Sequence, residues 1–172
     1  RLVGSEMCIR DRDTPQSLLE DVKNNLPLLY DVDEDYKVSL LKYSENIIYK
    51  VEFGKSSHVV FRIHRPGYHD IEELEGEIRW MDEIHKDTQV RLPVVYRGRD
   101  GGFLQKMRTS GGETVYCSVI SFLDGSPLGE LKGEALLDGL EKLGEITARL
   151  HIQSINRDKS CLLYTSPSPR DA

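Results

Sequence analysis

Cysteine is scarce in this sequence. Of the three cysteines, Cys8 and Cys161 lie close to the two ends, and only Cys117 lies in the interior. A single interior thiol cannot close an internal disulfide, and it supplies too few ligands for a cysteine-based zinc site. These absences exclude a disulfide-stabilised scaffold and favour a reducing cytoplasm. Because its strand segment is apolar, we expect Cys117 to be an inert core thiol.

Long apolar runs and an excess of positive charge are also missing. No stretch approaches the roughly 20 apolar residues that a membrane-spanning helix requires. The chain has 23 Lys and Arg residues against 29 Asp and Glu residues, which gives a formal net charge of −6. Nucleic acids and anionic membrane surfaces select basic proteins. The acidic balance therefore argues against nucleic acid and against membrane as partners.

The two ends of the chain, residues 1–12 and 161–172, have no strand or helix period. With permitted codons, one DNA element encodes the first end and its complementary strand encodes the second. Two unrelated protein segments would almost never share this property, and the DNA resembles the transposon-end adapter of sequencing libraries. We interpret both ends as adapter-derived tails and leave them out of the fold. Natural tails are the alternative.

Hydrophobic periodicity predicts the elements between these ends. Thr14 caps a helix that starts at Pro15, and Pro27 is expected to end it. Alternation of apolar and polar residues predicts strands, the first three forming a meander. The predicted strands are 37–43, 47–53, 58–64, 94–96, 103–107 and 114–120. A hairpin turn is expected at 100–102, where Asp-Gly-Gly occurs.

Two further helices are predicted. Asp70 caps the first, and Glu73, three residues later, completes a capping-box pair. Apolar residues keep helical spacing from there to Ile84, and a second apolar stripe runs through 136–150. The element order is that of an α+β fold with a protein-kinase-like N-lobe. We expect about five antiparallel strands crossed by one helix, followed by the first long helix of a C-lobe.

Five stretches carry a resemblance to a known family. In their order they resemble the aminoglycoside phosphotransferase and choline kinase family, which is part of the protein-kinase-like superfamily. The stretches are SENIIYKV (44–51), VVFRIHRPGYH (59–69), GEIRWM (76–81), SFLDG (121–125) and LGEITARLH (143–151). The resemblance implies a nucleotide-binding N-lobe over 13–123 and the start of a truncated helical C-lobe over 124–160.

The third predicted strand contains the sharpest site candidate. By the resemblance, Arg62 stands where kinases place a cation against the α- and β-phosphates of ATP. A guanidinium suits this position because its planar fork bonds phosphate oxygens in pairs. Val60 shares its face and would cover the adenine. The alternative is an ordinary solvated arginine on an exposed strand.

Glu77 lies on the capped helix, one position from its apolar stripe. In kinases a glutamate on this helix pairs with the strand cation and holds it toward the phosphates. The resemblance therefore pairs Glu77 with Arg62. The alternative is a surface carboxylate, as expected for the nearby Glu72 and Glu75.

Two loops complete the candidate nucleotide site. Glu45 and Asn46 lie in the turn between the first two strands, where backbone N–H groups could hold phosphates. No glycine occurs between residues 37 and 53, so a plain hairpin is an equal alternative. By the resemblance, Phe122 and Leu123 fit the hinge that meets the adenine edge through its backbone.

The catalytic segment of the family is not found in residues 13–160. Phosphoryl transfer needs a base near the acceptor hydroxyl and side chains that hold Mg²⁺. In the family a His-Gly-Asp stretch and later residues supply these groups after the long helix, and no His-Gly-Asp occurs here. We therefore expect the sequence as written to be inactive. Its parent is expected to use ATP and Mg²⁺ to phosphorylate a hydroxyl of a small molecule.

Two other functional classes remain open from the sequence. One is a catalytically dead kinase-like module that binds nucleotide or a partner without turnover. The other is an unrelated α+β interaction domain that shares the element order by chance. The first predicts that the parent lacks His-Gly-Asp, and the second predicts that Arg62 and Glu77 lie apart.

Overall fold

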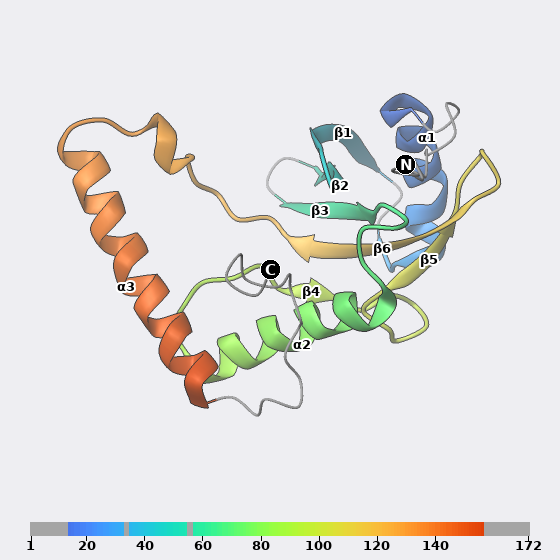
Figure 1. Ribbon diagram of the computed structural model, residues 1–172. Helices are drawn as coiled ribbons and strands as arrows, with labels where there is room; N and C mark the ends of the chain where they lie inside the picture. The colour runs from blue at the N-terminus through green and yellow to red at the C-terminus, as the bar shows by residue number, and fades with distance from the viewer. Residues whose placement is uncertain (1–13, 33–34, 55–56, 157–172) are drawn as a thin grey trace, which may run out of the picture. The chain divides into compact units, whose positions relative to one another are not determined.

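The computed structural model describes residues 14–32, 35–54 and 57–156 of the chain (Figure 1). Within these residues it contains six strands and three α-helices, which confirms the α+β class. The helices are α1 (Pro15–Leu29), α2 (Ile71–Asp87) and α3 (Glu134–Asn156), with a short 3₁₀ turn, η1 (Leu128–Glu130). The strands are β1 (Tyr36–Tyr43), β2 (Asn46–Phe53), β3 (Ser57–His64), β4 (Val95–Tyr96), β5 (Gln105–Arg108) and β6 (Thr114–Ser121).

All strand pairs of the sheet are antiparallel. The order is β1-β2-β3-β6-β4, and β5 pairs with the other half of β6. The predicted meander of the first three strands is confirmed. The strand register places Arg62 opposite Ile48 on β2 and opposite Ser118 on β6. Because side chains alternate along a strand, these pairs fix which residues share each face.

Helix α1 covers one face of the sheet. Its buried residues Leu18, Val22 and Leu26 join a core cluster with every second residue of the strands. The strand members of this cluster are Ile47, Tyr49, Val51, Phe61, Ile63, Met107, Val115, Cys117 and Val119. Burial raises the pKa of the Cys117 thiol to about 12. That thiol is therefore an inert core group, as the sequence predicts.

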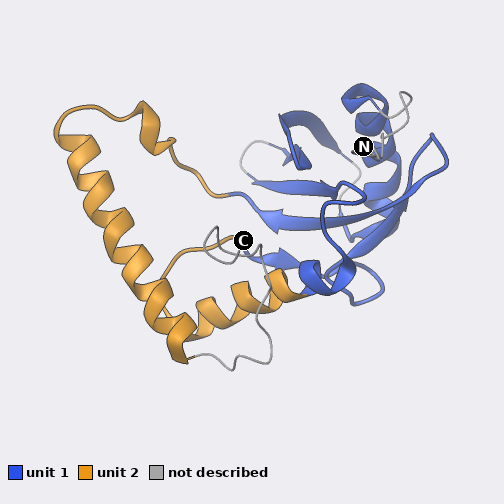
Figure 2. Cartoon of the chain, viewed as in Figure 1, with its two compact units in different colours: residues 1–75, 94–122 blue, residues 76–93, 123–172 orange. Residues whose placement is uncertain are grey.

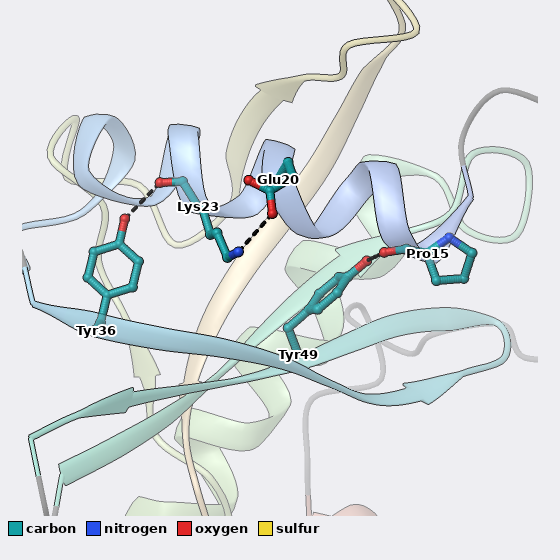
Figure 3. A network of polar contacts seen from close by, with 5 residues as sticks. All are labelled: Pro15, Glu20, Lys23, Tyr36 and Tyr49. Carbon is teal, nitrogen blue, oxygen red and sulfur yellow. Dashed lines mark hydrogen bonds and ion pairs between the residues drawn. The ribbon is translucent and has the colours of Figure 1, made fainter.

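Two tyrosine hydroxyls fasten α1 to the sheet (Figure 3). Tyr49 on β2 donates to the carbonyl of Pro15 at 2.8 Å, and Tyr36 on β1 donates to the carbonyl of Lys23 at 2.7 Å. Burial raises the pKa of both hydroxyls, so they stay protonated and keep donating. The two bonds lie eight helix residues apart and therefore fix the direction in which α1 crosses the strands.

Replacing Tyr49 with phenylalanine is expected to destabilise the chain by about 1 kcal/mol, because it removes one buried hydrogen bond and keeps the ring. Urea unfolding followed by circular dichroism measures the change. Tyr96→Phe is the matched control: Tyr96 is 44% exposed, and its substitution should cost less than about 0.5 kcal/mol. Equal losses in the two variants would show that the Tyr49 bond does not hold α1.

The chain divides into two compact units (Figure 2). The first comprises the described parts of residues 1–75 and 94–122, and the second those of 76–93 and 123–172. In the second unit Gln153 of α3 accepts from Trp80 at 3.1 Å and donates to Asp87 at 3.2 Å. This buried amide ties α3 to the later turns of α2. Several apolar residues of α3 stay exposed: Leu137, Leu140, Leu143, Ile146, Ile152 and Ile155.

Three sequence predictions of local structure need correction. Pro27 does not end α1, because it removes only one N–H in the last turn and the Tyr30 amide closes that turn onto Leu26 at 2.9 Å. The turn at 100–102 exists, but it is not a hairpin, since β4 and β5 pair with β6 and not with each other. The long helix continues past residue 150 to Asn156.

Candidate functional site

The face of the sheet opposite α1 carries the predicted nucleotide residues of β2 and β3. Phe61 and Ile63 are fully buried on the α1 side, so Arg62 and Val60 point to the other side. Arg62 is half-buried between Ile48 and Ser118, while Val60 is buried between Lys50 and Ile120. The prediction that Val60 and Arg62 share one face is therefore correct.

At one end of this face lies an aromatic contact that the sequence does not predict. The Phe122 ring, directly after β6, meets the His58 ring edge-on with centroids 4.6 Å apart. The ammonium of Lys50 lies 5.4 Å from the Phe122 centroid and bonds Glu52 at 2.8 Å. This ammonium lowers the pKa of the Glu52 carboxyl. The side chain of Phe122 thus anchors the predicted hinge to β2 and β3.

Leu123 differs from its neighbour in the predicted hinge. It is 38% exposed and belongs to the second unit. The boundary between the units falls between Phe122 and Leu123. The two predicted hinge residues therefore lie where the chain leaves the sheet.

The turn between β1 and β2 lies at the other end of the same face. Its two linking residues are Ser44 and Glu45, and the amide of Ser44 donates to the carbonyl of Asn46 at 3.0 Å. Asn46 pairs with His64 and therefore shares the face of Arg62, whereas Glu45 is exposed. The structure thus brings Asn46, Arg62 and Val60 onto one surface.

A buried polar pair lies beside Arg62 and was also missed. Nε2 of His64 and Oγ of Ser118 are 3.0 Å apart, and both side chains are less than a tenth exposed. Buried polar atoms cost stability unless they are bonded. Only the register reveals this pair, because the two residues are 54 positions apart in the chain.

Glu77 is positioned by the capping box that the sequence predicts. The Glu73 amide donates to Asp70 at 2.9 Å, and the Asp70 amide donates to Glu73 at 3.1 Å, so α2 begins where expected. Glu77 lies in the second turn of that helix, half-buried, within the second unit. Its approach to Arg62 in the first unit stays a prediction.

The described part of the chain shows neither a metal cluster nor a membrane span. Within it, no three His, Cys, Asp or Glu side chains gather where they could hold a metal ion. None of its helices combines the length and the apolar character needed to cross a bilayer.

A comparison with known protein families shows which family the chain belongs to. The model of the phosphotransferase enzyme family, APH, matches residues 42–162, which include all the candidate site residues described above. The chain belongs to this family. Membership in the phosphotransferase family confirms the resemblance seen in the sequence.

Solved structures agree with the family. The chain resembles the structure of a microcompartment-associated aminopropanol kinase with a TM-score of 0.66 and 30% identity, covering 80% of this chain and 41% of that one. It shares the fold of the amicoumacin kinase hAmiN, solved with AMP-PNP, Ca²⁺ and Ami, at a TM-score of 0.52 and 18% identity, covering 62% and 31%. The chain thus spans less than half the length of these kinases. Comparison with curated protein sequences found no match.

Proposed function

We propose that this chain is the nucleotide-binding part of an ATP-dependent phosphotransferase that phosphorylates a hydroxyl of a small molecule. The observation that carries the proposal is the sheet face with Arg62 at its centre. Along the face lie a backbone turn, a cation and an apolar surface, in that order, with the hinge at the far end. Family membership and the two kinase structures support it.

The spacing of this face suits an elongated anionic ligand. His58, which contacts Phe122 at the hinge end, precedes Arg62 by four strand residues, or about 13 Å. Between them the partly exposed Ile120, which pairs with the buried Val60, offers apolar surface for a purine ring. An adenine near Phe122 would therefore leave its phosphates at Arg62. The guanidinium would bond two phosphate oxygens at once and would stay charged at any physiological pH.

The residues present fit the nucleotide, and their roles follow from position. Arg62 would hold the α- and β-phosphates, Val60 would cover the adenine, and the Phe122 and Leu123 backbone would meet its edge. Glu45 and Asn46 would border the phosphates, and Glu77 would orient Arg62. Bound Mg²⁺ would neutralise charge on the transferred phosphoryl group. We propose that its ligands and the acceptor site lie in the part of the family fold that this chain does not span.

The test is phosphoryl transfer by the full-length product of the source gene. The source locus is sequenced on both sides, the complete product is purified, and ATP consumption is measured with hydroxyl-bearing amines, amino acids and sugars. We expect magnesium-dependent transfer to one of these classes, and a His-Gly-Asp stretch after α3. A complete product that lacks this stretch and binds ATP without turnover would contradict the proposal and indicate a catalytically dead module.

A further inference from the structure

The segment that follows β3 folds back on itself. The Tyr68 amide approaches the Arg65 carbonyl at 3.5 Å, with Pro66 and Gly67 between them. Proline fixes φ at the second position of a type II turn, and Gly67 has the positive φ of +83° that the third position requires. This turn brings the Tyr68 ring into contact with the side chain of Arg65, three residues earlier in the chain.

The Arg65 guanidinium lies close to two aromatic rings, one at the end of β1 and one in its own turn. Its central carbon lies 5.3 Å from the Tyr43 centroid and 5.1 Å from the Tyr68 centroid. Its Nη1 donates to the carbonyl of Ser44 at 2.9 Å. A planar guanidinium can face two rings and still donate in its plane, which the ammonium of lysine cannot do. Arg65 therefore connects the end of β3 to the turn between β1 and β2.

The connected turn is the one that borders the proposed phosphate position. It contains no glycine, and its last residue, Asn46, pairs with His64, the neighbour of Arg65. A turn whose amides bind an anion loses affinity when it must first be ordered. The bond to Ser44 and the contact with the Tyr43 ring restrict the β1 side of the turn, and the pairing of Asn46 with His64 restricts the β2 side.

We propose that Arg65 is a positioning residue for nucleotide phosphates: it holds the turn at Ser44 to Asn46 in its binding conformation. The inference rests on the proposed function, because it assumes that the nucleotide occupies this face of the sheet. Arg65 itself need not touch the ligand. Its effect should therefore appear for ligands that carry phosphates and vanish for those that do not.

The experiment titrates the 172-residue chain with Mg·ATP and separately with adenosine, followed by amide chemical shifts. The variants are Arg65→Lys, which keeps the charge, and Tyr68→Leu, which removes one exposed ring. Arg99→Lys is the matched control. Arg99 also donates to a backbone carbonyl, that of Tyr30 at 3.2 Å, but this bond does not involve the turn at Ser44 to Asn46. The chemical shifts of core amides verify that each variant is folded.

We expect Arg65→Lys to weaken ATP binding about tenfold and Tyr68→Leu to weaken it less, because both leave the turn to be ordered on binding. Adenosine binding should stay within about twofold, and Arg99→Lys should bind both ligands like the unchanged chain. Equal ATP affinity in a folded Arg65→Lys or Tyr68→Leu variant would overturn the positioning role and leave the proposed function standing. Failure of the unchanged chain to bind ATP would overturn both.

Discussion

Replacing Arg62 with alanine should reduce phosphoryl transfer by the complete product about 10²-fold, because it removes a fixed cation from the phosphates. Stability should change by no more than about 1 kcal/mol, since the guanidinium lies on the face away from the core cluster and its loss opens no core cavity. Initial rates under saturating ATP and urea unfolding of the same preparations give the two numbers.

Arg108→Ala is the charge-matched control for this substitution. Arg108 is an exposed arginine at the end of β5 and pairs with Thr114, four residues along β6 from Ser118, the partner of Arg62. Its loss should leave the rate within about twofold, because surface substitutions away from a site have small effects. Equal losses of activity in the two variants would indicate a general charge effect and argue against a specific role of Arg62.

Replacing the neighbouring residue, Phe61, should lower the stability of the chain strongly. Phe61→Ala is expected to destabilise the chain by about 3 to 5 kcal/mol, because it opens a cavity in the core. The Phe61 side chain is fully buried and meets the Tyr30 ring edge-on at 6.4 Å. Such a loss is a large fraction of the roughly 5 to 15 kcal/mol that stabilises a whole domain.

Urea unfolding of Phe61→Ala beside Arg62→Ala checks this contrast within one strand. We expect a large fall in the unfolding midpoint for the first variant and at most a small one for the second. A stable Phe61→Ala chain, or an Arg62→Ala chain that unfolds as readily, would show that the two faces of β3 are assigned the wrong way round.

The sequence predicts the two faces of β3 because, over residues 58–64, only one of them is entirely apolar. Phe61 and Ile63 alternate with Arg62, and the apolar set must face α1. The start of α2 is equally predictable, since a capping box involves residues only three apart. Local patterns therefore locate most of the candidate site.

Contacts between residues that are far apart in the chain cannot be predicted from local sequence patterns. The Arg-Pro-Gly segment at 65–67 predicts a break in the sheet, but the bond of Arg65 to Ser44 depends on strand register. The same holds for the His64 and Ser118 pair and for the ring contact of Phe122. The hairpin expected at 100–102 was wrong for a related reason, because β6 competes as the partner of both adjacent strands.

The most direct test of the nucleotide site is an amide chemical-shift titration of the unchanged chain with Mg·ATP. The account predicts weak binding, because the chain spans only part of the family fold. It also predicts that the largest shifts fall on Ile48, Val60, Arg62 and the Ser44 to Asn46 turn, and that they vanish in Arg62→Ala. Saturable shifts confined to other parts of the sheet, or unchanged in Arg62→Ala, would contradict it.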